Sequence, residues 1–102
     1  MVDLPVYFYK VRAHDGFYWA YLCPDQGVFR YERNVRLCAR DIVGISQKCD
    51  KPIRRIFSTP PISSVDEISG HISHREDWVA LPLSWWQKRR YNKEIDKALK
   101  GG

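Results

Sequence analysis

The sequence predicts an α+β fold: an N-terminal antiparallel β-meander of four or five strands, then a short helix and a C-terminal amphipathic basic helix. Three observations lead to this prediction. Residues 5–58 contain short runs of β-branched and aromatic residues separated by turn residues. Pro60-Pro61 then interrupts the strand pattern, and the last 20 residues place apolar side chains at helical spacing. We therefore expect a single domain over residues 1–102, with the sheet at about 5–58, Pro60-Pro61 as a connector and a helical part at about 63–100.

Four strands are expected in the first 40 residues. They are Val6–Arg12, Phe17–Cys23, Val28–Arg33 and Val35–Arg40. His14-Asp15-Gly16 supplies the first turn, because glycine readily takes positive φ, and Pro24–Gly27 supplies the second. In the fourth strand Val35, Leu37 and Ala39 alternate with other residues, which predicts one buried face and one solvent-exposed face.

The middle of the chain gives weaker signals. The segment IRRIFS, residues 53–58, is expected to form a short edge strand ahead of the two prolines. Ser64 and Glu67 have capping-box spacing, which predicts a short helix. The following segment HREDWVALP is expected to be a connector in which Trp78 covers the core.

The last helix has the strongest local signal. Ser84 is a favourable N-cap, and Gln87 three residues later completes an S-x-x-Q capping box. Basic residues near the helix end suit the negative end of its dipole. We therefore expect a helix that begins directly after Ser84.

Composition limits the class of protein. The chain has 102 residues, of which 44% are hydrophobic and 14% aromatic, so a packed core is expected rather than disorder. No run approaches the roughly 20 apolar residues of a membrane span, and no signal sequence is visible. We expect a cytoplasmic protein without a membrane partner. The odd set Cys23, Cys38 and Cys49 predicts reduced thiols, with Cys23 and Cys38 packed as small apolar residues on strands.

Positive charge is concentrated at the C-terminus. Residues 1–83 carry 11 Lys/Arg against 10 Asp/Glu, whereas residues 84–102 carry six Lys/Arg against Glu94 and Asp96. The body is nearly neutral and the tail is basic. This asymmetry indicates either an anionic partner for the last helix or a solvated helix face.

A helical wheel separates the two adjacent tryptophans of this helix. With Trp85 at about 0°, the apolar residues Tyr91, Ile95, Ala98 and Leu99 fall at roughly 220–320°, and the basic residues fall at about 40–140° with Trp86 among them. We therefore expect Trp85 to anchor the helix to the core and Trp86 to be presented among cations. The predicted binding residues are Trp86, Arg89, Arg90, Lys93 and Lys97.

The predicted sheet supplies secondary binding candidates. Aromatic and basic residues interleave on its strands, a pattern that can stack bases or contact phosphates. These candidates are Tyr18, Tyr31, Arg36, Arg40, Arg54 and Arg55. The alternative explanation for the aromatic residues is core packing or half-exposed structure, which is common on strands.

Catalysis, metal binding and cofactor binding have little support in the sequence. No nucleophile-elbow, phosphate-loop or zinc-protease motif is present, and the cysteines lack a C-x-x-C pair. We predict no metal, no cofactor and no enzymatic activity. The alternative is a small ribonuclease-like site that uses His71 or His74 with Arg75 and Glu76.

The sequence is compatible with two functions. In the first, the protein is an adaptor or inhibitor that docks on a larger protein, including one that processes nucleic acid. Size, aromatic content and lack of catalytic motifs suggest by analogy a phage or mobile-element host-takeover factor. In the second, the basic helix and the aromatic strands bind nucleic acid directly. The near-neutral body favours the protein partner, because a phosphate track needs a wider spread of charge.

Overall fold

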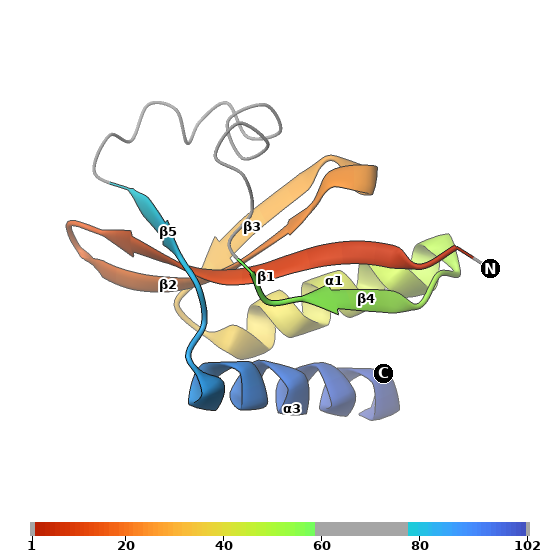
Figure 1. Cartoon of the computed structure of the whole chain (residues 1–102). Coiled ribbons are helices and arrows are strands. Elements are labelled where there is room, and N and C mark those ends of the chain that lie inside the picture. Colours follow the sequence, from red (N-terminus) through yellow and green to blue (C-terminus); the bar gives the residue numbers. More distant parts are fainter. Residues whose placement is uncertain (1, 59–77, 102) are drawn as a thin grey trace.

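The computed structural model describes residues 2–58 and 78–101. In chain order these residues form β1 (Leu4–Ala13), β2 (Gly16–Cys23), the 3-10 helix η1 (Pro24–Gln26), β3 (Val28–Glu32), α1 (Val35–Cys49), β4 (Ile53–Ile56), β5 (Val79–Leu81) and α3 (Trp85–Gly101). The strands form one mixed sheet, and both long helices lie against the same side of it (Figure 1). The α+β prediction is confirmed.

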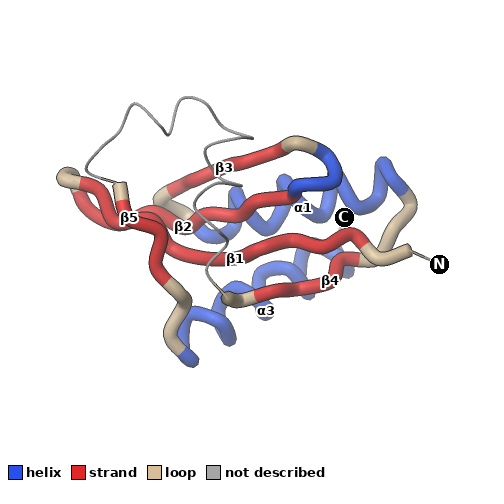
Figure 2. The backbone as a smooth tube through the Cα atoms, turned by 45° about the horizontal axis from the view of Figure 1, so that its top comes forward, coloured by secondary structure: helices blue, strands red, loops and turns tan. Residues whose placement is uncertain are grey.

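The central strand of the sheet is β1. The strand order is β3-β2-β1-β4, and β5 also pairs with β1. β4 runs parallel to β1 from Leu4↔Ile53 to Tyr7↔Ile56, whereas β5 is antiparallel and pairs further along, from Lys10↔Leu81 to Arg12↔Val79. β4 and β5 therefore follow one another along the same side of β1 (Figure 2).

Both predicted turns are present. Gly16 has φ of 125° at the β1–β2 turn, a conformation that suits glycine, and Gly27 has φ of 62° after η1. β1 and β2 form an antiparallel hairpin from Tyr7↔Leu22 to Ala13↔Gly16. The N-terminal meander of β1, β2 and β3 thus follows from local turn chemistry.

The predicted fourth strand at residues 35–40 is wrong, because these residues begin helix α1. Asn34 caps the helix by accepting a hydrogen bond from the backbone N–H of Arg36 at 2.9 Å. The residues of α1 that are buried recur at helical spacing: Val35, Cys38, Ala39, Ile42, Val43 and Ser46. The period-2 alternation over six residues was too short to distinguish a strand from a helix. Cys38 consequently packs from a helix, while Cys23 lies at the end of β2 as expected.

Two further segments form strands of the sheet. The edge strand predicted over residues 53–58 is present as β4, although it is parallel to its neighbour. Val79–Leu81 form β5, where a connector was expected. The short helix predicted from Ser64 lies outside the described residues.

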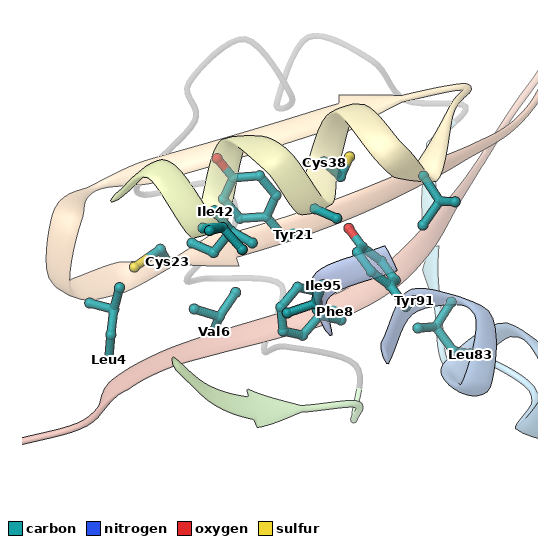
Figure 3. Close-up of a cluster of buried hydrophobic side chains, with 13 residues drawn as sticks. Leu4, Val6, Phe8, Tyr21, Cys23, Cys38, Ile42, Leu83, Tyr91 and Ile95 are labelled. Atoms are coloured by element: carbon teal, nitrogen blue, oxygen red, sulfur yellow. The ribbon is translucent and has the colours of Figure 1, made fainter. Parts of the chain in front are cut away.

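The main core fills the space between the sheet and the two helices (Figure 3). Tyr91 of α3 is fully buried there, with its ring 4.6 Å from that of Phe8 and 5.6 Å from that of Trp19. Its hydroxyl donates to the backbone carbonyl of Ala20 at 3.2 Å, which satisfies the buried polar group. Ile95, one turn further along, is also fully buried. Burial of these two side chains fixes α3 under the sheet.

A second apolar cluster covers the opposite face of the sheet. Its buried members are Tyr9, Val11, Ala20 and Leu22, and half-buried aromatic rings pack around them. Trp78 belongs to this cluster, with its ring 4.7 Å from that of Tyr31. Trp78 therefore covers a core, as predicted, and this core lies on the sheet face away from the helices.

Candidate functional site

The start of α3 is fixed by the predicted capping box. The backbone N–H of Ser84 donates to Oε1 of Gln87 at 2.8 Å, and the backbone N–H of Gln87 donates to Oγ of Ser84 at 3.4 Å. These two hydrogen bonds satisfy two backbone N–H groups that would otherwise lack an acceptor at the start of the helix. It sets the rotational position of Trp85 and Trp86 on the first helical turn.

Both tryptophans are exposed. Trp85 is 61% exposed and Trp86 is 72% exposed, and their rings meet edge to face with centroids 4.7 Å apart. The guanidinium of Arg89 lies over the Trp85 ring at 5.6 Å. The presentation of Trp86 is as predicted, whereas the prediction that Trp85 anchors the core is wrong. Leu83, 4% exposed and just before the helix, packs into the core instead.

The contact stripe of α3 is narrower than the wheel suggested. Tyr91 and Ile95 are the buried residues of the helix, and Ala98 packs against the same core from a half-buried position. Leu99, which the wheel placed on the docking face, is 46% exposed. Because the sheet is covered by two helices, each helix offers it only part of its apolar arc. The remaining arc, with Trp85, faces outward.

Six basic residues lie on α3. Lys97 is 3.8 Å from Glu94 in an ion pair that is mostly exposed on the lysine side. The other five form no ion pair within the described part of the chain: Lys88, Arg89, Arg90, Lys93 and Lys100. Because the two charged atoms are 3.8 Å apart and the lysine side is exposed to solvent, the Lys97–Glu94 pair contributes little. Helix α3 therefore carries largely uncompensated positive charge.

An open groove of about 950 Å³ runs along α3. Phe57, directly after β4, lines it together with one side of the helix from Trp85 to Lys100. We call this the α3 groove. Five of its lining residues are cations: Lys88, Arg89, Lys93, Lys97 and Lys100. Three of the predicted binding residues thus come together in it, namely Arg89, Lys93 and Lys97, while Trp86 and Arg90 do not line it.

Arg55 links β4 to two α3 residues that line the groove. Its guanidinium donates to Oδ1 of Asn92 at 2.7 Å and to Oδ1 of Asp96 at 2.7 Å. Asp96 is the carboxylate that lines the groove, and Arg55 offsets its charge. Arg55 was predicted as a binding residue, and the structure gives it the role of tethering β4 to α3. Its neighbour Arg54 is exposed.

The other secondary candidates do not form one surface. Arg36 and Arg40 are exposed on α1, which packs on the helix side of the sheet. Tyr18 and Tyr31 belong to the cluster on the opposite sheet face, with their rings 5.5 Å apart and perpendicular. Arg36 and Arg40 are thus on the helix side of the sheet, whereas Tyr18 and Tyr31 are on its other face.

Tyr18 is also engaged by its own local network. Its hydroxyl donates to Oδ2 of Asp15 at 2.6 Å, and the Arg33 guanidinium lies over its ring at 4.5 Å. The hydrogen bond from Tyr18 lowers the pKa of the Asp15 carboxyl, and the nearby Arg33 acts in the same direction. Asp15, Tyr18 and Arg33 together stabilise the β1–β2 turn, and the Tyr18 ring is not a free stacking surface.

The described part of the chain has few residues arranged for metal binding or catalysis. Residues 2–58 and 78–101 contain no group of three or more His, Cys, Asp or Glu placed to hold a metal ion. The ribonuclease alternative rests on His71, His74, Arg75 and Glu76, which lie outside the described residues. Over the same described ranges, the helices are too short or too polar to cross a membrane.

Sequence reasoning missed the groove itself. It is lined by α3 and by Phe57, which are far apart in the chain, and the pairing of β4 with β1 places Phe57 beside the helix. A signal was available in Asn92 and Asp96, whose i, i+4 spacing places two acceptors on one side of a helix.

The chain matches no family model, no curated protein and no solved structure. The geometry of α3 therefore carries the functional argument.

Proposed function

We propose that the protein is a small non-enzymatic adaptor or inhibitor that binds an acidic region of a larger protein through α3. One observation carries this proposal. Trp85 and Trp86 are exposed side by side on a helix whose basic residues are almost all without ion pairs among the described residues. By the analogy of size and composition, we place the protein among phage or mobile-element factors that act on a host enzyme.

Exposing two tryptophans is unfavourable for an isolated protein. Each ring is a large apolar surface, and burial of apolar area contributes roughly 25 cal/mol per Å². Tryptophan and arginine are also the residues most often found at the energetic centre of protein interfaces. The Trp85–Trp86 pair, with Arg89 against it, has the composition expected of such a centre.

Several features favour a protein partner over nucleic acid. Tyr18 and Tyr31, the aromatic residues proposed for base stacking, are packed in a cluster with Trp78. Arg55 is engaged by Asn92 and Asp96. Single-strand binding uses aromatic faces along a continuous basic track. The excess of positive over negative charge is concentrated on one helix, a distribution that suits an acidic patch on a protein.

The first experiment separates the two classes of partner. Fluorescein-labelled single- and double-stranded oligonucleotides are titrated with the protein across a salt series. In parallel, a displayed library of random peptides is selected on the wild-type protein and counter-selected on Trp86→Ala. We expect the library to yield acidic peptides whose binding depends on Trp86, with oligonucleotide binding that is weak and unchanged by Trp86→Ala.

Matched variants make the result specific. Phe17→Ala removes another exposed aromatic residue, 51% exposed and on the β1–β2 hairpin, and is the control for Trp86→Ala. Arg36→Ala/Arg40→Ala on α1 is the control for Arg89→Ala/Arg90→Ala on α3. Oligonucleotide binding at micromolar affinity, with a steep salt slope and loss in the α3 variants alone, would contradict the proposal and establish a nucleic-acid-binding module.

A further inference from the structure

Strand β4 lies at one edge of the described sheet. It is the last strand in the order β3-β2-β1-β4, so no described strand pairs with its side away from β1. The backbone N–H of Leu4 donates to the carbonyl of Pro52 at 2.7 Å. This bond shows which residues of this segment direct their backbone groups toward β1. In such a ladder alternate residues bond to the same neighbour. The N–H and C=O groups of Ile53 and Arg55 are therefore directed away from β1.

The α3 groove lies along this same edge. Phe57, which follows β4, and the Arg55 contacts to Asn92 and Asp96 place the strand next to the groove. From Trp85 to Lys100 the helix rises about 22 Å at about 1.5 Å per residue. An extended chain of about seven residues covers the same length. The groove thus matches an extended peptide of about seven residues in length, and the four residues of β4 lie beside part of it.

The charges of the groove define the peptide that fits. In an added strand alternate side chains point to the same face. One set would face α3 and meet Lys88, Lys93 and Lys97, so carboxylates at alternate positions are complementary there. The groove carboxylate, Asp96, is already paired with Arg55 and does not oppose them.

We propose that an extended acidic segment of the partner protein adds as a strand along the outer side of β4 and lays its carboxylates along the α3 groove. This inference rests on the proposed function, since it names the part of the partner that α3 recognises. Main-chain hydrogen bonds to Ile53 and Arg55 supply affinity, and the cations select acidic side chains. Trp85, at one end of the groove, contacts an apolar residue beyond the acidic run.

A second copy of this chain does not fit the same edge. Pairing of β4 with β4 of another copy would bring two cationic α3 helices close to each other. Each helix contributes six basic residues and only Glu94 and Asp96, so the two surfaces repel. The charged edge therefore discourages self-association while leaving the strand open to an acidic chain.

Backbone methylation of a probe peptide tests strand addition directly. The probe is a fluorescein-labelled peptide of about eight residues that alternates threonine and glutamate. Two isomers carry N-methyl groups either on all threonines or on all glutamates, so both keep the charge of the parent. An added strand bonds β4 through one set of amides only. We expect one isomer to lose at least about tenfold in affinity and the other to remain within about twofold of the parent.

Protein variants locate the peptide. Lys93→Gln/Lys97→Gln is expected to weaken the parent peptide severalfold, while Lys48→Gln on the exposed side of α1 leaves its affinity unchanged. Equal affinity of the two isomers, whether both bind or both fail, overturns strand addition. So does a parent peptide that does not bind at low salt.

Failure of this inference and failure of the proposed function have different signatures. If strand addition is wrong but the function is right, peptides selected from the library still depend on Trp86 and show no preference between methylation phases. If the function is wrong, the library yields no Trp86-dependent peptide and the oligonucleotides bind through α3. The methylated peptides therefore test the added strand, and the library tests the class of partner.

Discussion

Arg55 on β4 and Asp96 on α3 form a hydrogen-bonded ion pair at 2.7 Å, and the same guanidinium reaches Asn92. The arginine side chain is 26% exposed and the aspartate side chain 56% exposed. These contacts connect an edge strand to the basic helix. They hold β4 against α3 beside the α3 groove, in addition to the core contacts of Tyr91 and Ile95.

Replacing this arginine should loosen the groove at moderate cost in stability. We expect Arg55→Ala to lower the free energy of unfolding by about 1 kcal/mol, because solvent screens a partly exposed ion pair. Arg54→Ala, on the exposed neighbour, should change it by less than about 0.5 kcal/mol. Urea denaturation of both variants measures the difference. Equal stabilities would show that the Arg55 contacts do not tether the two elements.

The exposed tryptophans should matter little for stability. Trp85→Ala and Trp86→Ala are each expected to change the free energy of unfolding by less than about 0.5 kcal/mol. Tyr91→Ala, which empties a fully buried site, should cost about 3–5 kcal/mol. Thermal and urea unfolding of the three variants provides the comparison. A loss from Trp85→Ala comparable to that from Tyr91→Ala would restore Trp85 as a core anchor.

The N-cap of α1 provides a test of why residues 35–40 are helical. Asn34→Ala removes the side chain that accepts from Arg36, so a loss of about 1 kcal/mol is expected. Asn34→Asp, which can accept the same hydrogen bond, should retain most of the stability. If Asn34→Ala and Asn34→Asp unfold at the same urea concentration, the cap does not contribute.

The three thiols should differ in reactivity. Cys23 and Cys38 are buried, and Cys49 is half-buried at the end of α1. Burial raises the pKa of the Cys38 thiol to about 12 and also raises the pKa of Cys23. We expect an aromatic disulfide reagent near neutral pH to label Cys49 first and the other two only as the protein unfolds. Cys49→Ser should remove the fast phase, and rapid labelling that survives this change would contradict the assignment.

Stability should fall in alkaline solution. The Cys38 thiol has a pKa of about 12 in the folded protein against an ordinary value of 9.0, so the unfolded chain loses this proton first. Its contribution is fully present below about pH 9 and is lost as the pH rises toward 12. Burial also raises the pKa values of Tyr9, Tyr21 and Tyr91, which acts in the same direction.

The contribution of Cys38 to the alkaline dependence can be separated from that of the tyrosines. Urea denaturation at a series of pH values above 8 gives the slope of unfolding free energy against pH. In Cys38→Ala this slope should be shallower by up to about 1.4 kcal/mol per pH unit, the effect of one proton. An unchanged slope would show that Cys38 does not contribute.

Local patterns predicted the parts of the fold that local chemistry decides. The β1–β2 hairpin follows from Gly16 at its turn, and the start of α3 follows from Ser84 and Gln87. Residues 35–40 were misassigned because Val35, Leu37 and Ala39 fit a strand over a short window. Extending the window to Ser46 shows helical spacing, and Asn34 is a standard cap.

The site was harder to predict because it depends on contacts distant in the sequence. A helical wheel gave the direction of the apolar arc of α3 but not how much of it the sheet would cover. Leu83, outside the helix, packs into the core, and Trp85 remains exposed. The parallel pairing of β4 with β1 could not be inferred from β4 alone, and the α3 groove depends on it.

The position of β1 in the middle of the sheet sets an order for assembly. Its hairpin with β2 joins neighbours in the chain, whereas β4 and β5 pair with it only after long stretches of intervening sequence. Short loops close more readily than long ones, so we expect the hairpin to form early and α3 to close the core last. Detaching α3 would uncover Phe8 and Trp19 without breaking the hairpin. The proposed partner, once bound at α3, would hold the final layer of the fold in place and should slow the opening of the whole protein.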